Sequence, residues 1–190
     1  MSCTAFEGTR RIACGELSDV ALKTKEVIDR GPHAPVLIFD DRTSEVVEVD
    51  FRGTAAQILK RLPRTAPEAP ESDPDTPRGP GRPRLGVVAR EVTLLPRHWE
   101  WLNRQPGGAS VALRKLVEHA RKANEGRDRI RLARESAYRF ISAMAGNEPG
   151  FEEAARALFA GSRDRFEEHS RPWPADVRAH ARKLAEAGLS

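Results

Sequence analysis

The chain has 190 residues, of which 39% are hydrophobic, and this length and composition favour folded cores, here two small ones, over wholesale disorder. No stretch approaches the roughly 18 consecutive apolar residues of a membrane span, and the first residues lack the pattern of a secretory signal, so we expect a cytoplasmic protein. The formal net charge of +4 becomes informative when it is divided along the chain.

Residues 1–62 predict a small α+β head. Apolar periodicity and turn residues indicate two strands, a helix, two strands and a second helix, at residues 4–7, 11–14, 16–30, 36–39, 47–51 and 55–62. In the fourth strand Val47, Val49 and Phe51 alternate with polar residues, which is typical of a half-exposed strand. Thr54 is expected to be the N-cap of the second helix.

Residues 63–84 predict a proline-rich linker. They hold 7 of the 14 prolines, mixed with acidic and hydroxyl side chains, and such a composition cannot build a core. The end of the linker turns basic, and Gly81-Arg82-Pro83 is similar to the core of an AT-hook, although Pro80 stands where the hook has its first arginine. The resemblance implies that Arg82 lies in a DNA minor groove, and Arg84 beside the motif is a further candidate contact. A chance match in a proline- and arginine-rich linker remains the alternative.

All of the excess positive charge comes from residues 78–134. This segment carries 14 Lys or Arg against 5 Asp or Glu, whereas residues 1–62 and 135–190 each carry a net charge of −1 and residues 63–77 a net charge of −3. Clustered cations favour polyanion binding, because each neutralised phosphate releases condensed counterions. A basic helix face that is simply solvated is the alternative interpretation.

Residues 85–124 predict a strand followed by two helices. A β-prone run at 90–95 precedes Pro96, a residue typical of the first helical position, and Gly107-Gly108 then separates the two helices. Ser110 is expected to be the N-cap of the second helix. The residues expected to face inward are Leu95, Trp99, Leu102, Leu113, Leu116, Val117 and Ala120, with Arg114 and Lys115 facing outward.

This order resembles the ribbon-helix-helix (Arc/MetJ/CopG-like) DNA-binding family through Leu95-Pro96, Gly108-Ala109-Ser110 and the basic helix that follows. The resemblance implies a homodimer whose strands enter the major groove of double-stranded DNA, and a phosphate clamp at Ser110. The register is open, because either Arg90 or Thr93 faces the DNA. The DNA-contact candidates of the whole chain are Arg82, Arg84, Arg90, Thr93, Arg97, Ser110, Arg114 and Lys115. An ordinary strand and helical hairpin is the competing interpretation.

Residues 125–190 predict a small helical bundle. Apolar positions recur at helical spacing over 128–145 and 151–160, and Pro174 opens a last helix. We expect Gly126 to separate the first of these helices from the basic helix before it. Over nearly its full length the chain also resembles an uncharacterised bacterial family, domain of unknown function 2239, at 90–120, at 150–154 and at 173–178. That resemblance implies no activity.

The common catalytic and metal-binding motifs are not found in the sequence. There is no GxSxG, Walker A, GxGxxG or HExxH motif, the five histidines are scattered, and Cys3 and Cys14 are too few for a disulfide framework. We therefore expect free thiols, no cofactor, no metal and no enzyme activity. The sequence favours a DNA-binding protein, either a transcriptional regulator or a nucleoid-associated factor. The alternative is a non-enzymatic adaptor that binds another protein.

Overall fold

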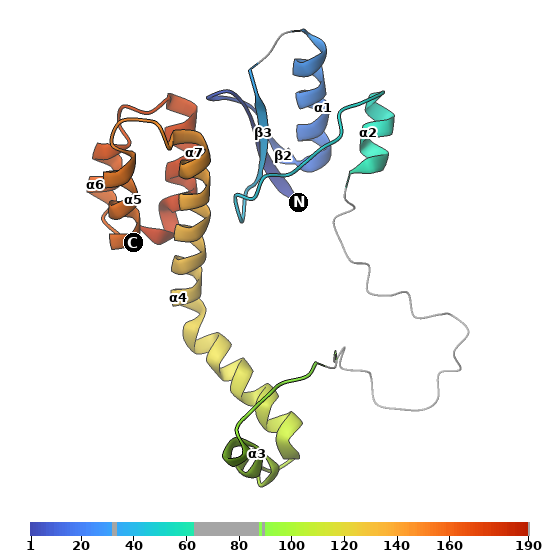
Figure 1. The fold of residues 1–190 in the computed structure, drawn as a ribbon, viewed down its shortest axis with the longest axis vertical. Helices are drawn as coiled ribbons and strands as arrows, with labels where there is room; N and C mark the ends of the chain where they lie inside the picture. The colour runs from blue at the N-terminus through green and yellow to red at the C-terminus, as the bar shows by residue number, and fades with distance from the viewer. Residues whose placement is uncertain (32–33, 63–87, 89, 190) are drawn as a thin grey trace. The chain divides into compact units, whose positions relative to one another are not determined.

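The computed structural model describes residues 1–31, 34–62, 88 and 90–189, and the chain divides into two compact units (Figure 1). One unit combines residues 1–65 with 126–190, and the other spans 66–125. The described residues form a three-stranded antiparallel sheet and seven α-helices, which confirms the α+β class. In this part of the chain no helix combines the length and the apolarity that crossing a bilayer requires. The predicted linker, residues 63–84, lies wholly outside the described residues.

The sheet consists of β1 (Ser2–Glu7), β2 (Arg10–Glu16) and β3 (Val36–Asp40), in the order β2-β1-β3. β1 is central, and its alternate side chains enter two clusters on opposite faces. Cys3 and Ala5 pack with Val20 of helix α1 (Leu17–Asp29), whereas Phe6 packs with the C-terminal helices. Consecutive residues of the central strand, 3–6, are therefore buried, because both faces of the strand are covered.

The predicted fourth strand, residues 47–51, is not a strand in the structure. Val46 forms an isolated bridge to Phe39, and the Val47 amide donates to the Ile38 carbonyl at 2.8 Å. The chain then leaves the sheet, because the Asp50 carboxylate accepts the Arg52 amide in a local turn. The expected alternation still holds as packing, since Val47, Val49 and Phe51 lie partly buried against the cluster around Val20.

Helix α2 (Ala55–Arg61) begins at the predicted residue. Thr54 accepts a hydrogen bond from the Gln57 amide at 3.4 Å, and the Gln57 side chain accepts one from the Thr54 amide at 2.9 Å. These two bonds form a capping box, which satisfies two amides that a helix start would otherwise leave without partners. The prediction of Thr54 as the N-cap is confirmed.

Helix α4 (Gly108–Ala145) is continuous through Gly126, so the predicted break there is wrong. A glycine in a helix interior costs only about 1 kcal/mol, and ion pairs one turn apart support the next turns of α4, with Arg131 between Asp128 and Glu135. The remaining helices are α5 (Phe151–Ala160), α6 (Arg163–His169) and α7 (Ala175–Ala185), followed by a 3-10 turn, Glu186–Gly188. Helix α6 is absent from the sequence prediction, and Pro174 precedes α7 as expected.

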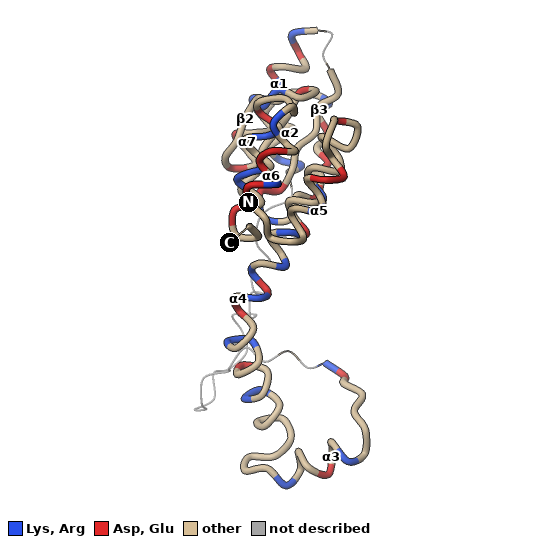
Figure 2. Tube along the Cα trace, turned by 90° about the vertical axis from the view of Figure 1, so that its left-hand side faces the viewer, with Lys and Arg blue, Asp and Glu red and all other residues tan. Residues whose placement is uncertain are grey.

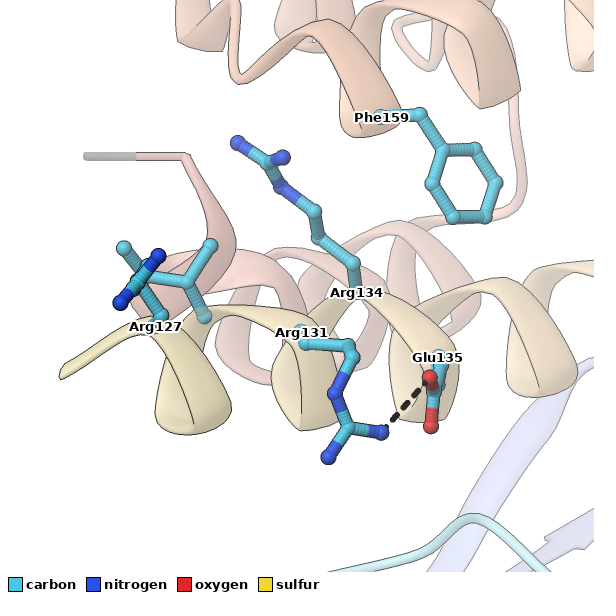
Figure 3. A pocket seen from close by; sticks show the side chains of 6 residues that line it. Arg127, Arg131, Arg134, Glu135 and Phe159 are labelled. Carbon is cyan, nitrogen blue, oxygen red and sulfur yellow. Dashed lines mark hydrogen bonds and ion pairs between the residues drawn. The ribbon is translucent and has the colours of Figure 1, made fainter. Parts of the chain in front are cut away.

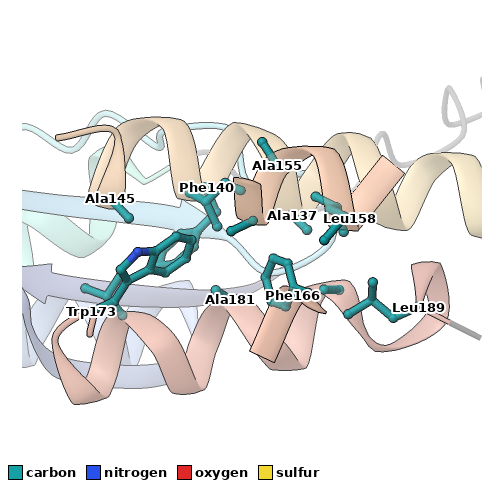
Figure 4. Packing of buried hydrophobic residues seen from close by; sticks show 14 of the residues in the cluster. Ala137, Phe140, Ala145, Ala155, Leu158, Phe166, Trp173, Ala181 and Leu189 are labelled. Atoms are coloured by element: carbon teal, nitrogen blue, oxygen red, sulfur yellow. The ribbon is translucent and has the colours of Figure 1, made fainter. Parts of the chain in front are cut away.

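The sheet and the C-terminal helices share one hydrophobic core (Figure 4). The Phe140 ring of α4 lies 5.5 Å from that of Phe6 and 5.2 Å from that of Phe39, measured between ring centroids. Phe166, Trp173 and Leu189 extend the same cluster. The sequence assigns residues 1–62 and 125–190 to separate domains with separate cores, whereas the structure packs Phe6 and Phe39 directly against the helices.

His180 of α7 is buried in this core, and its titration predicts how stability depends on pH. The imidazole lies 4.6 Å from the Phe140 ring and 5.6 Å from the Phe6 ring, and its Nε2 has no hydrogen-bond partner among the described residues. Burial lowers the pKa of His180 from 6.5 to about 4, although the nearby Asp41 carboxylate acts in the opposite direction. Lys183 and Arg11, the other charged groups facing it, lower this pKa further.

Between pH 6.5 and 4 the unfolded chain is protonated at His180, whereas the folded chain is not. The free energy of unfolding should therefore fall as the pH drops from 6.5 to 4. The loss approaches about 3 kcal/mol at the lower end of this window, since one pKa unit corresponds to about 1.4 kcal/mol. Urea unfolding between pH 7.5 and 4.5 measures it. The His180→Met variant should lose this pH dependence, and His119→Gln, a change at an exposed histidine, should retain it. An unchanged slope in His180→Met would assign the dependence to other groups.

Candidate nucleic-acid interface

Helix α3 (Pro96–Asn103) begins at the proline that the sequence singles out. Leu95 is its N-cap and Pro96 occupies the first turn, where a missing amide hydrogen has no cost. Leu102 is buried, whereas Trp99 is half-buried and Trp101 is 51% exposed. The helix therefore covers Leu102 inside its own unit and leaves an indole exposed to solvent.

Two glycines make the connection between α3 and α4. Gly107 and Gly108 have φ values of +86° and +75°, and the Gly108 amide donates to the Gln105 carbonyl at 2.9 Å. The positive φ favours glycine at position 107, and a Cβ atom there would also lie in a tight contact, 3.1 Å from the Val111 side chain.

Because α4 begins at Gly108, Ser110 lies in its first turn, and the prediction that Ser110 is the N-cap is wrong. The glycines make the turn, so no side-chain cap is needed at Ser110. The amides of a first turn have no intrahelical acceptor and carry the positive end of the helix dipole. Ser110 is exposed beside these amides, so the start of α4 remains open to an anion.

Residues 90–95 form no strand within the part of the chain that the structure describes. Val92 is 51% exposed and Leu95 is 49% exposed. A β-strand needs a neighbouring strand to satisfy its backbone, and the described residues of this unit contain none. The predicted strand is therefore absent from the single chain.

The apolar stripe of α4 is uncovered in the single chain. Leu116 is 48% exposed, Val117 is 65% exposed, and Ala120 is also exposed. These residues follow helical spacing on one side of α4, yet Ala112 is the only buried residue in the described start of the basic helix, 108–122. The expectation that Leu116, Val117 and Ala120 face inward is wrong for one copy of the chain.

The exposed cations of this unit differ in whether they have an acidic partner. The Glu118 carboxylate pairs with Arg121 at 2.9 Å and with Lys122 at 3.8 Å, and the hydrogen bond from Arg121 lowers the pKa of Glu118. Four predicted contacts have no ion-pair partner among the described residues and keep their full charge for a ligand: Arg90, Arg97, Arg114 and Lys115. Figure 2 shows Lys and Arg recurring along α4.

The structure places six of the eight candidate DNA contacts. Ser110 and Arg114 lie one turn apart on α4, next to Lys115, and Arg97 lies on α3. Arg90 and Thr93 lie in the irregular segment before α3, and all six side chains are exposed. Arg82 and Arg84, with the AT-hook-like motif, lie outside the described residues.

No group of three or more His, Cys, Asp or Glu that could hold a metal occurs in the described chain. Both cysteines are free, and burial raises the pKa of the Cys3 thiol to about 11, so that Cys3 is protonated at neutral pH.

Comparison with known proteins identifies one family. A family model described as "Uncharacterized protein conserved in bacteria (DUF2239)" matches residues 2–185. No curated protein and no solved structure matches the chain.

Proposed function

Since the chain belongs to the uncharacterised bacterial family DUF2239, we propose from its own chemistry that it binds double-stranded DNA as a homodimer. One observation carries the proposal: segment 90–122 exposes an apolar stripe and, beside it, cations without acidic partners. An exposed apolar stripe is typical of a protein-protein interface, and exposed cations without acidic partners favour binding to a polyanion. A ribbon-helix-helix dimer satisfies both. The proposed role is that of a transcriptional regulator or a nucleoid-associated factor.

A second copy of the chain would allow residues 90–95 to form a strand. Two antiparallel copies of residues 90–95 would supply each other with backbone partners and would bring Leu95, Leu116 and Val117 of both chains together. The three side chains are each about half exposed or more in one copy, so their burial in a dimer is a source of stability.

The start of α4 suits the phosphate clamp that the ribbon-helix-helix resemblance implies. Its first-turn amides have no acceptor within the helix, and Arg114 lies one turn further on, without an acidic partner among the described residues. Amides and an arginine at this position favour a phosphate oxygen electrostatically.

We expect a dimer at tens of micromolar protein, about the range where such small folds are paired, and a monomer after Leu116→Glu. A charge placed in the shared apolar stripe would be buried without a partner. Sedimentation equilibrium measures the mass. Leu132→Glu is the matched control, because Leu132 is 54% exposed on the same helix but lies outside segment 90–122. A wild-type monomer that binds no DNA would favour the adaptor function, with the stripe docking another protein.

Substitutions in the proposed phosphate clamp and in segment 90–95 should have different effects on DNA affinity. Ser110→Ala combined with Arg114→Ala should weaken binding to every duplex about equally, because phosphate contacts carry no base information. Arg90→Ala should instead reduce binding to the preferred site by about 1 to 3 kcal/mol, if Arg90 reads a guanine. Titrations on a selected site and on random duplex distinguish the two. If both variants bound both duplexes as the wild type does, the basic residues would be solvent-exposed without a role in DNA binding.

A further inference from the structure

A pocket of about 340 Å³ lies between α4 and α5 in the unit that contains residues 126–190 (Figure 3). It is lined by Arg127, Ile130, Arg131, Arg134 and Glu135 of α4 and by Phe159 of α5. This volume is at the lower end of the range for small-molecule sites. The lining combines an aromatic ring and an aliphatic side chain with three arginines against one acid.

Arg134 is held in position within this pocket. Its Nε donates to the Gly188 carbonyl at 2.9 Å, and a Cβ atom added to Gly161 would lie 2.6 Å from its Nη2. The guanidinium thus lies against the Gly161 backbone on one side and is tied to the Gly188 carbonyl by a hydrogen bond. Its two terminal nitrogens have no hydrogen-bond partner among the described residues. A guanidinium fixed in this way loses little entropy when it binds an anion, and its planar fork matches a carboxylate or a phosphate.

The single acid of the pocket is already neutralised. Glu135 pairs with Arg131 at 3.1 Å, and in Figure 3 this pair points away from the space that Arg134 and Phe159 enter. An anion beside Arg134 therefore meets no uncompensated carboxylate from the pocket lining.

Phe159 forms an apolar side of the pocket, and its ring is only partly covered by the rest of the fold. Its side chain is 49% exposed, and its ring lies 5.3 Å from that of Tyr138, which is 41% exposed. Figure 3 shows the Phe159 ring and the Arg134 side chain extending from opposite helices into the same space. A ligand ring stacked on Phe159 would bury surface that no other described side chain covers.

We propose that this pocket binds a small aromatic anion, with Arg134 holding a carboxylate or phosphate group and Phe159 contacting the ring. The site is independent of the proposed DNA contacts, none of which lines it.

Isothermal titration of the full-length protein tests the proposal with four probes: benzoate, adenosine 5′-monophosphate, adenosine and inorganic phosphate. We expect benzoate or the nucleotide to bind with a Kd below about 1 mM, at least about tenfold tighter than adenosine and phosphate. Tighter binding of benzoate identifies the anion as a carboxylate, and tighter binding of the nucleotide identifies it as a phosphate. Binding by neither ring anion, or equal binding of inorganic phosphate, would overturn the proposal.

Variants locate the binding. Arg134→Lys keeps the positive charge but removes the planar guanidinium, and it should weaken binding by about ten- to a hundredfold. Phe159→Leu removes the aromatic ring at an exposed position that folding does not require. Arg156→Gln is the control, since Arg156 lies on α5 and pairs with Glu153 outside the pocket. Equal affinity of Phe159→Leu and the wild type, or an equal loss in Arg156→Gln, would refute the site whatever the stability of Arg134→Lys.

Discussion

The affinity of the full-length protein for double-stranded DNA is expected to fall by about three to five orders of magnitude between 50 and 200 mM salt. Arg90, Arg97, Arg114 and Lys115 are exposed and have no ion-pair partner among the described residues. Since Arg90 is assigned to a base, the other three cations of each copy give about six phosphate contacts in a dimer, and six to ten contacts produce a loss of this size. Fluorescence anisotropy at several salt concentrations measures the slope.

A matched pair of double variants separates local contacts from net charge. Arg114→Gln with Lys115→Gln removes four cations from the dimer and should make the slope of log affinity against log salt shallower by about three to four. Arg163→Gln with Arg165→Gln changes the net charge equally at exposed positions of α6, and should leave the slope nearly unchanged. A salt-independent affinity of the wild type would exclude the electrostatic mechanism. Equal slopes for both double variants would place the contacts elsewhere.

Local signals predicted the starts of α2 and α3, because these signals lie within a few residues of each start. Thr54 caps α2 through a bond to its own neighbour, and Pro96 fixes the first turn of α3. Such features need no information about residues that are distant in the sequence.

Features that depend on distant partners could not be predicted in this way. The apolar pattern of residues 47–51 indicates packing against the sheet, yet it does not reveal that the chain leaves the hydrogen-bond ladder after Val47. Gly126 looks like a helix break, but its cost of about 1 kcal/mol is small against the packing and ion pairs of a long helix. Helix α6 is short and buries only Phe166 fully, which gives a periodicity analysis little signal.

Composition pointed to the exposed cations of the candidate interface more directly than periodicity did. The basic excess of residues 78–134 led to Arg114 and Lys115, which are exposed and have no ion-pair partner among the described residues. Helical spacing identified Leu116 and Val117 as one apolar stripe, but spacing cannot distinguish a core of the same chain from a surface covered by a second copy. The Arg134 pocket was missed because its parts, Arg134, Phe159 and Gly188, meet only in the fold.

Phe140→Ala should lower the free energy of unfolding of the whole unit containing residues 1–65 and 126–190 by about 3 to 5 kcal/mol. Phe140 is fully buried, and its ring contacts rings from β1, β3 and α7, namely Phe6, Phe39 and His180. The resulting cavity would adjoin all three elements, so local relaxation cannot easily fill it. A loss of this size is a large part of the roughly 5 to 15 kcal/mol that stabilises a typical domain.

The change should act on the sheet and on the C-terminal helices together, because one core joins them. Urea unfolding of Phe140→Ala should give a single transition at lower urea, and hydrogen exchange should show amides of β1 and of α7 losing protection in parallel. Phe159→Ala is the control, because a ring that is 49% exposed contributes far less to folding. If β1 kept its protection while α7 lost it, residues 1–62 would fold independently, as the sequence division into separate domains predicts.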